Sequence, residues 1–313
     1  MPSILTITMN PAIDISTTVD RVQPFRKLRC APARRDPGGG GINVARVLNR
    51  LNVDVVALYP AGGFYGQLLQ NLLKNESIRS RVIPIDEETR EDFTVEETTS
   101  GSEYRFVSTG PLLQESEWRA CLEEIAGFRE PVDMIVASGS LPPGVPEDFY
   151  AEVAKIARAR KTPITLDASG PSLRAALDEG VDLLKPSLRE MRELTGEPLA
   201  DPSSCIAACR LLVTSGKAGA VALTLGSQGA VLVTAEGAWR AWPLPIKAVS
   251  TVGAGDSFLA AMVCALTSGR SHAEAFAHGV AGGSAALLSP GTQLCHPDDM
   301  RELLTHVVVD RAP

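Results

Sequence analysis

The segment STVGAGDSF at residues 250–258 decides how this chain is interpreted, because two glycines and an aspartate precede the apolar residues 259–266. Glycines at the start of a helix leave the backbone amides open to an anion, and the helix dipole adds positive potential there. Gly255 can adopt conformations closed to other residues. Asp256 follows directly, where its carboxylate could accept a proton from a hydroxyl that attacks a phosphoryl group. The alternative is a tight turn in which Asp256 only caps the helix.

A second glycine cluster, PGGGGINVA at residues 37–45, also runs into an apolar helix. Four consecutive glycines cost chain entropy, so some contact must require bare backbone at this point. A polyol lying on the glycines, with Asn43 donating to its hydroxyls, would explain them, whereas the alternative is a flexible loop. Neither cluster has the spacing of a P-loop or of a dinucleotide-binding GxGxxG motif.

Around these clusters, short apolar runs alternate with helical segments along the whole chain. The strand-like runs lie at residues 55–59, 134–137, 163–166, 183–184 and 220–224. The helix-like stretches lie at residues 44–51, 66–75, 146–160, 188–195 and 205–215. This alternation predicts an α/β fold with a mainly parallel sheet and helices on both faces.

Residues 14–36 and 90–108 break this rhythm, because polar and apolar side chains alternate there. Residues 94–97 and 103–107, joined through Ser100 and Gly101, indicate a hairpin. Neither stretch can form a core of its own. We therefore expect one domain over residues 1–313, with these two segments forming a small β-sheet lid.

Composition excludes several partners. The 313 residues carry 37 acidic and 30 basic side chains, a formal charge of -7, which does not favour nucleic acid or anionic lipid. Residues 1–7 indicate a buried strand rather than a signal peptide, and no apolar run approaches the ~20 residues of a membrane span. We expect a cytoplasmic protein without a nucleic-acid or membrane partner.

Together these segments resemble the ribokinase-like (PfkB) carbohydrate kinase family. Residues 253–256 are similar to the C-terminal signature of that family, and residues 38–43 to its N-terminal signature. Further similar segments occur in the expected order: NPAID at 10–14, SGSLPPG at 138–144, KPS at 185–187 and TLGSQG at 224–229. The resemblance covers essentially the whole chain. SGSLPPG is typical of the phosphofructokinase branch of the family, and KLRC at 27–30, YRFV at 104–107 and GTQLC at 291–295 favour the minor, ribokinase-type members of that branch.

The resemblance implies roles for individual residues. Asp256 would be the catalytic base, and the backbone of Gly253, Ala254 and Gly255 would form an anion hole for the transferring phosphoryl group. The sugar hydroxyls would be held by Asp14, Gly39, Gly40 and Asn43. The phosphate already on the sugar would be held by Arg90 and Ser138, with Lys27 and Arg29 nearby or from a partner subunit. An arginine suits this role because its planar fork pairs with phosphate, although a solvated surface position is the alternative for Arg90.

The nucleotide side follows from the same resemblance. ATP would contact Lys185, Ser187, Thr224, Gly226, Ser227, Gly229 and Gly283. The family often has Asn-x-x-Glu where this chain has SLRE at residues 187–190. Glu190 would organise Mg²⁺ through water, since Mg²⁺ commonly keeps several of its waters. Ser187 replaces an amide with a shorter hydroxyl, which leaves the metal and nucleotide contacts at this position open.

Related enzymes also bind potassium in a loop, mainly through backbone carbonyls. The corresponding residues here are Ser250, Val252, Ala286, Ser289, Gly291 and Gln293. Ser289 and Gln293 offer neutral side-chain oxygens, and the alternative is a purely structural loop.

The resemblance thus implies ATP-dependent phosphorylation of fructose 6-phosphate to fructose 1,6-bisphosphate. The alternating pattern of the lid exposes one apolar row that has no core of its own to cover, which predicts a homodimer formed through the lid. The resemblance also suggests that a second ATP binds near Lys27 and inhibits. The alternatives are phosphorylation of fructose 1-phosphate or tagatose 6-phosphate, and a sugar-phosphate sensor without catalysis. A nucleoside kinase is less favoured, because only 5% of residues are aromatic and few could stack on a base.

Overall fold

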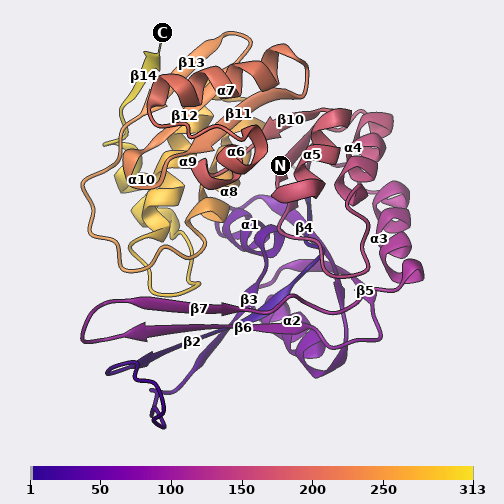
Figure 1. Ribbon diagram of the computed structural model, residues 1–313. Coiled ribbons are helices and arrows are strands. Elements are labelled where there is room, and N and C mark those ends of the chain that lie inside the picture. The colour runs from indigo at the N-terminus through magenta and orange to yellow at the C-terminus, as the bar shows by residue number, and fades with distance from the viewer. Residues whose placement is uncertain (1–2, 313) are drawn as a thin grey trace.

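A ten-stranded sheet forms the centre of the computed structural model, which describes residues 3–312 (Figure 1). Its strands are, in spatial order, β14 (Val309–Ala312), β13 (Gly237–Ala241), β12 (Ala230–Thr234), β11 (Ala218–Thr224), β10 (Val181–Leu184), β9 (Ile164–Asp167), β8 (Met134–Ser138), β1 (Ser3–Ile7), β4 (Asp54–Ala61) and β5 (Arg79–Pro84). The strands from β5 to β11 run parallel, and β12, β13 and β14 continue the sheet antiparallel. The predicted mainly parallel sheet is confirmed; Met1 and Pro2 of the expected first strand lie outside the described residues.

Helices cover both faces of this sheet (Figure 1). One face packs against α1 (Gly40–Arg50), α2 (Gly63–Asn75), α8 (Ala254–Thr267), α9 (His272–Ala286) and α10 (Pro297–Leu304). The other packs against α3 (Glu115–Gly127), α4 (Phe149–Arg160), α5 (Gly170–Glu179), α6 (Leu188–Thr195) and α7 (Pro202–Thr214). Both faces need this cover because the strands are apolar on both sides. In β4, Val55 and Tyr59 belong to one hydrophobic cluster, whereas Val56 and Leu58 point to the opposite face and belong to the other.

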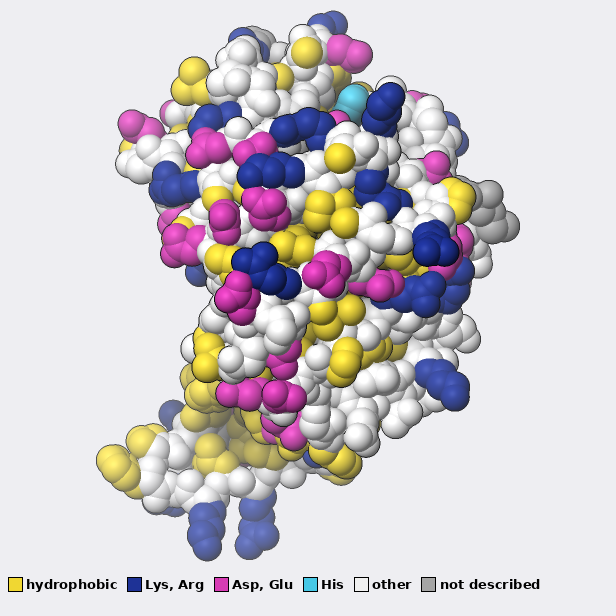
Figure 2. Space-filling model, turned by 90° about the vertical axis from the view of Figure 1, so that its right-hand side faces the viewer, with side chains coloured by type: hydrophobic (Ala, Val, Ile, Leu, Met, Phe, Trp, Pro, Cys, Tyr) yellow, Lys and Arg dark blue, Asp and Glu magenta, His cyan; other side chains and the backbone are white. Residues whose placement is uncertain are grey.

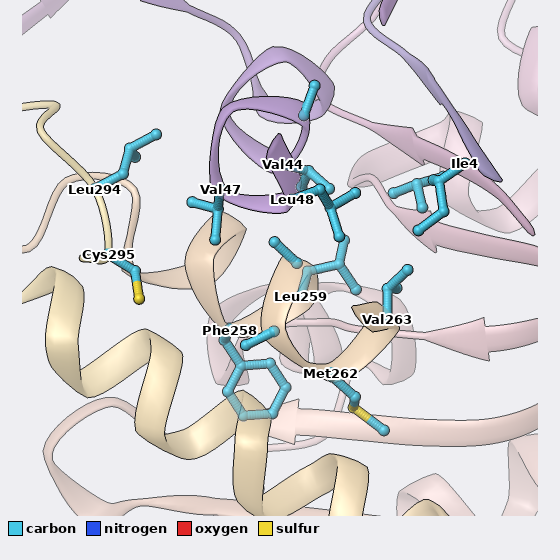
Figure 3. Packing of buried hydrophobic residues seen from close by; sticks show 14 of the residues in the cluster. Ile4, Val44, Val47, Leu48, Phe258, Leu259, Met262, Val263, Leu294 and Cys295 are labelled. Atoms are coloured by element: carbon cyan, nitrogen blue, oxygen red, sulfur yellow. The ribbon is translucent and has the colours of Figure 1, made fainter. Parts of the chain in front are cut away.

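The first of these clusters fixes helix α8 against helix α1. Val44 and Leu48 of α1 face Leu259 and Val263 of α8 across the cluster (Figure 3), and all four are fully buried. This contact sets where the N-terminus of α8 lies. The glycine segments at residues 37–45 and 250–258 are therefore brought together by packing.

The carboxyl ends of the parallel strands gather polar residues at one edge of the sheet. Ser138 ends β8, Asp167 ends β9, Lys185 follows β10, and Thr224 ends β11. These strands are neighbours in the sheet, so the four side chains meet at one edge. In open α/β sheets this edge is where ligands bind.

A second sheet of four strands projects from the body of the molecule (Figures 1 and 2). Its order is β3 (Arg34–Gly38), β2 (Ala12–Val19), β6 (Arg90–Glu97) and β7 (Glu103–Val107). It includes the expected hairpin, β6–β7, and its strands β2 and β3 extend slightly beyond both ends of the expected segment 14–36. Figure 2 shows hydrophobic surface along this projection and at its tip, and Lys or Arg side chains that protrude from its lower side. No helix in residues 3–312 is long and apolar enough to span a membrane.

Helices α8 and α9 pack so closely that a methyl group would disrupt them. A Cβ added at Gly282 would lie 2.6 Å from Ala261 Cβ and 2.8 Å from the Ser257 carbonyl oxygen. We expect Gly282→Ala to destabilise the protein by ~1–3 kcal/mol through overpacking, lowering Tm by several degrees in calorimetry. Gly127→Ala is the matched control, because a Cβ at Gly127 meets nothing within 4 Å. An equal loss in both variants would contradict this explanation.

Candidate active site

The N-terminus of α8 presents its backbone amides into the space between the glycine segments. Gly253 precedes the helix in the left-handed region, with φ 71°, which a side chain would disfavour. The first-turn amides of Gly255 and Asp256 have no carbonyl of their own helix to donate to. This end of the helix is therefore suited to an anion.

Asp256 stands in that first turn and is tied to the other glycine segment. Asn43 Nδ2 donates a hydrogen bond of 2.9 Å to Asp256 Oδ2, and Asn43 is itself 5% exposed. Burial raises the pKa of Asp256 above its ordinary value, although the Asn43 hydrogen bond and the Lys185 charge oppose that effect. A half-buried carboxylate held in one orientation and with a raised pKa is a stronger base than a fully solvated one.

Lys185 brings a positive charge to the same place. A Cβ on Gly255 would lie 3.3 Å from Lys185 Nζ, so the ammonium group lies directly beside the first turn of α8. Lys185 Nζ pairs with Asp167 Oδ1 at 3.1 Å. Burial opposes the charge, but Asp167, Glu190 and Asp256 together raise the pKa of Lys185 and keep it protonated. The ammonium group can therefore face an anion bound at the helix N-terminus.

Asp167 is a residue that sequence reasoning missed. It links the two sides of the site, because Ser138 Oγ donates to Asp167 Oδ2 at 3.4 Å while Lys185 pairs with Oδ1. Burial raises the pKa of Asp167 to about 6, against the effect of the Lys185 charge. Its place at the end of a parallel strand was the signal that could have identified it.

Gly38 and Gly40 are required by close approaches of side chains expected at the site. A Cβ on Gly38 would lie 2.3 Å from Asp14 Oδ1, and a Cβ on Gly40 would lie 2.3 Å from Ser138 Oγ. Gly39 has φ 109° and also has no room for a side chain. The structure thus brings Asp14, Ser138 and Asn43 around one stretch of bare backbone.

Asp14 occupies the middle of a row of carboxylates on the four-stranded sheet. Across the strands it lies directly beside Asp36 on β3 and Asp92 on β6. Burial and the Asp92 charge raise the pKa of Asp14 to about 7, while nearby arginines oppose this. Asp36 and Asp92 are paired with Arg34 and Arg90, respectively.

Arg90 is more constrained than sequence analysis expected. Its Nη1 donates to Asp92 at 2.9 Å and to the Ser108 carbonyl at 2.8 Å, and its Nε and Nη2 donate to the Asn10 carbonyl at 3.3 and 3.1 Å. These bonds fasten the root of the projecting sheet to the body. Most of the donors of Arg90 are therefore already used.

Arg105, which sequence analysis did not select, is the freer cation. It lies on β7 and is exposed, and it lies opposite Thr94, on the same face as Asp92. Its positive charge lowers the pKa of both Asp14 and Asp256, which places it on the site side of the sheet. The alternation of the hairpin was the signal that could have selected it. Lys27 and Arg29, by contrast, lie on the exposed β2–β3 loop at the free end of the sheet (Figure 1).

On the nucleotide side, Ser187 and Glu190 form a capping box on α6. Glu190 N donates to Ser187 Oγ at 3.3 Å, and Ser187 N donates to Glu190 Oε2 at 2.7 Å. A bridge joins Ser187 to Thr224, which brings the segments 185–187 and 224–229 side by side. The hydroxyl that replaces the family's amide therefore has a structural partner, while one oxygen of Glu190 remains for other contacts.

The three glycines expected to contact the nucleotide differ in their surroundings. Gly226, which precedes Ser227 in a short 3₁₀ turn, faces open space. Gly229 would place a Cβ 2.2 Å from the Ala241 carbonyl oxygen. Gly283 would place one 3.2 Å from the Ala254 carbonyl oxygen. Close packing thus explains Gly229 and Gly283 without a nucleotide.

The expected cation-binding segments are adjacent in the structure. Val249 N donates to the Leu287 carbonyl at 2.7 Å, which joins residues 250–252 to residues 286–293. The oxygens there are mostly neutral, and Glu103 accepts a 3.0 Å hydrogen bond from Ser250 Oγ. Such a set fits a monovalent cation. Residues 3–312 contain no cluster of three or more His, Cys, Asp or Glu side chains that could hold a metal by themselves.

The open helix N-terminus, the half-buried Asp256 and the ammonium group of Lys185 are suited to transfer of a phosphoryl group to a small molecule. Comparison with known proteins identifies the class. The model of the pfkB family carbohydrate kinases matches residues 7–299. The chain belongs to this family, as the resemblance implied.

Curated relatives cover nearly the full chain. ATP-dependent 6-phosphofructokinase isozyme 2 of Mycobacterium tuberculosis H37Rv is 48% identical over 96% of this chain and 88% of its own. The isozyme 2 of Escherichia coli K12 is 38% identical over 98% and 99%. Crystal structures of the E. coli phosphofructokinase-2 with potassium and with fructose-6-phosphate match with TM-scores of 0.93 and 0.92, each over 98% of this chain and 99% of that one. A 1-phosphofructokinase of Bacillus subtilis is 30% identical over 98% and 99%.

The raised pKa of Asp14 predicts that this residue costs stability. Because its pKa rises from 3.8 to about 7 on folding, the destabilisation grows as pH rises from about 4 to about 7 and then stays constant. Asp14→Asn should therefore raise Tm by more at pH 8 than at pH 5, while it weakens sugar binding. Asp20→Asn, at an exposed position just beyond β2, is the control and should show no pH-dependent gain. An Asp14→Asn variant that is less stable than wild type at pH 8 would contradict the prediction.

Proposed function

We propose that the chain transfers the terminal phosphoryl group of ATP to the free primary hydroxyl of fructose 6-phosphate, giving fructose 1,6-bisphosphate. The observation that carries this proposal is Asp256, half-buried, held by Asn43 and adjacent to the open N-terminus of α8. The names of the two 6-phosphofructokinase relatives support the choice of substrate.

In this reaction the sugar hydroxyl oxygen forms a bond to phosphorus, the bond to the ADP oxygen breaks, and the hydroxyl proton goes to Asp256. The raised pKa of Asp256 favours that proton transfer. The negative charge of the transferring group would face the amides of Gly255 and Asp256 and the ammonium of Lys185. Preformed donors of this kind stabilise the transition state without reorganisation.

Asp14, Asn43 and the backbone of Gly39 and Gly40 would hold the sugar hydroxyls, with Ser138 beside them. We assign the existing phosphate of the sugar chiefly to Arg105, with the remaining donor of Arg90. Arg105 is favoured because it is exposed and lies near both Asp14 and Asp256.

We further propose that ATP lies along residues 185–187 and 224–229, with its magnesium held through water by Glu190. When bound, the metal would neutralise charge on the ATP phosphates. The capping box leaves one Glu190 oxygen to accept from a metal-bound water. Potassium would bind among residues 250–252 and 286–293, as the potassium complex of the E. coli relative suggests.

We also propose a homodimer formed by the outer face of the projecting sheet. Phe93, Tyr104 and Phe106 alternate onto that face and are exposed, at 42%, 37% and 61%. Pairing two such faces would remove this apolar surface from water. A tetrameric inhibited form is known for the E. coli relative, which is consistent with association in this branch of the family.

The test of the proposed function is a coupled ADP-release assay across fructose 6-phosphate, fructose 1-phosphate, tagatose 6-phosphate, ribose and adenosine. We expect the highest kcat/KM with fructose 6-phosphate, and a loss of ~10²–10⁴-fold in kcat for Asp256→Asn with substrate binding retained. Preference for fructose 1-phosphate would favour the 1-phosphofructokinase alternative. Absence of any sugar-phosphate-dependent turnover would leave the non-catalytic sensor.

The assignment of the phosphate predicts different behaviour for two arginines. Arg105→Ala should raise the KM for fructose 6-phosphate by roughly ten- to a hundredfold. Its Tm should not fall, because Arg105 is exposed and takes no part in the hydrogen bonds by which Arg90 fastens the projecting sheet to the body. Arg90→Ala should raise the same KM and also lower Tm, because it removes the ion pair with Asp92 and the donors to the carbonyls of Asn10 and Ser108. Neither variant should change the KM for ATP.

The matched control is Arg119→Ala, since Arg119 is exposed on α3, away from the projecting sheet, and pairs with Glu115 of the same helix. Its kinetic constants should stay within about twofold of wild type. An unchanged sugar-phosphate KM in the Arg105 variant, or a raised KM for ATP, would remove Arg105 from the proposed subsite.

A further inference from the structure

Leu294 has an unfavourable backbone conformation directly against the start of α8. It is fully buried, and its φ of 63° lies in the left-handed region that a leucine rarely adopts. A Cβ added to Gly253 would lie 2.3 Å from Leu294 Cδ2. The leucine side chain therefore lies over the glycine that precedes the anion-binding turn. Strain of this kind persists only where the surrounding structure imposes it.

Two arginines one turn apart on α1 hold Leu294 in this left-handed backbone conformation. Arg46 Nη1 donates to the Thr292 carbonyl at 3.1 Å. Arg50 Nη1 donates to the carbonyls of Gln293 and Cys295, on either side of Leu294. The backbone before and after the strained residue is thus held by charged donors, which form stronger hydrogen bonds than neutral ones.

The same segment is also fastened to α8 and to the four-stranded sheet. Cys295 N donates to Ser257 Oγ at 3.2 Å, within the first turns of α8. Thr292 Oγ1 donates to Asp36 Oδ2 at 3.0 Å. Residues 292–295 therefore touch three parts of the site: the catalytic helix, the projecting sheet and helix α1.

Helix α1 fixes Asp256 as well, through Asn43, which precedes Arg46 by one turn of the helix. Figure 3 shows Leu294 and Cys295 on their loop next to α1, with Val47 between that loop and Leu48. Glu76 balances the charge by pairing with Arg46 at 2.8 Å. One helix thus sets the position of the carboxylate directly and the position of the preceding glycine through Leu294.

We propose that residues 292–295 form a buttress that holds the amides of the anion hole in place, with Leu294 and Arg50 as its positioning residues. The inference rests on the proposed phosphoryl transfer, to which it adds residues that touch no substrate. The conformation of Gly253 sets the direction of the following amides, and these act on charge that develops as the phosphoryl group transfers. Removing the buttress should therefore lower kcat and leave both KM values unchanged.

The test compares Arg50→Met and Leu294→Ala with matched controls on the opposite face of the sheet. Arg174→Met removes an α5 arginine that also donates to two carbonyls, those of Glu193 and Leu194. Leu173→Ala removes an equally buried leucine from α5. We expect roughly a ten- to hundredfold lower kcat in the two buttress variants, with both KM values within about twofold, because small misplacements of catalytic groups have effects of this size. The controls should keep the wild-type kcat.

A second readout does not depend on turnover. Aluminium fluoride mimics the transferring phosphoryl group when it binds together with MgADP and fructose 6-phosphate. The affinity for this combination should fall in the buttress variants by the same factor as kcat. The affinity for MgADP alone should stay unchanged. Leu294→Met, which restores the contact, should recover most of the kcat. Leu294→Gly, which relaxes the backbone but leaves Gly253 uncovered, should behave like Leu294→Ala.

The proposal is overturned if kcat in Arg50→Met and Leu294→Ala stays within about twofold of wild type, or if the controls lose as much. It is also overturned if Leu294→Gly is fully active, because the side chain would then have no positioning role. Wild-type turnover across the panel of acceptors tests the proposed function separately, and the variants are compared with whichever acceptor proves best. Melting temperatures of all variants separate loss of folding from loss of positioning.

Discussion

The hydrogen bond from Asn43 to Asp256 joins residues 213 positions apart, and the site depends on it. It requires that helix α1 and helix α8 pack with their N-termini side by side, which the buried contact between Val44, Leu48, Leu259 and Val263 provides. Each glycine segment alone is only a bare turn before a helix. Their juxtaposition creates a space bounded by amides on one side and by a hydroxyl-binding surface on the other.

Electrostatics shape this space as much as packing does. The chain carries a formal charge of -7, and the half-buried carboxylates Asp14, Asp167 and Asp256 all have raised pKa values, chiefly because desolvation disfavours their charged form. Such an arrangement would repel a sugar phosphate and ATP unless cations were concentrated locally. Lys185 and Arg105 supply that charge from two different sides, the main sheet and the projecting one. The stability lost by burying carboxylates is a common cost of functional sites.

Sequence patterns anticipated the elements more reliably than the contacts of single side chains. Segments 188–195 and 205–215 were expected as helices, and the structure has α6 at Leu188–Thr195 and α7 at Pro202–Thr214. The antiparallel edge of β12 to β14 was not expected, because a buried antiparallel strand is as apolar as a parallel one. Arg90 was expected to be available to a phosphate. The structure shows its donors mostly used at the root of the sheet, a fact that depends on Asn10, Asp92 and Ser108 meeting in space.

The sequence by itself determined the α/β fold, the two glycine segments, the small second sheet and the family. These follow from local periodicity and from the order of the motifs, both of which are properties of the linear order of residues. Only the tertiary structure decided which cation is free, Arg105 rather than Arg90, and that Asp167 connects Ser138 with Lys185. It alone placed Leu294 over Gly253 and Arg50 beside the carbonyls that flank it. Such relations arise from burial and from donor geometry between residues distant in the chain, and no local pattern encodes them.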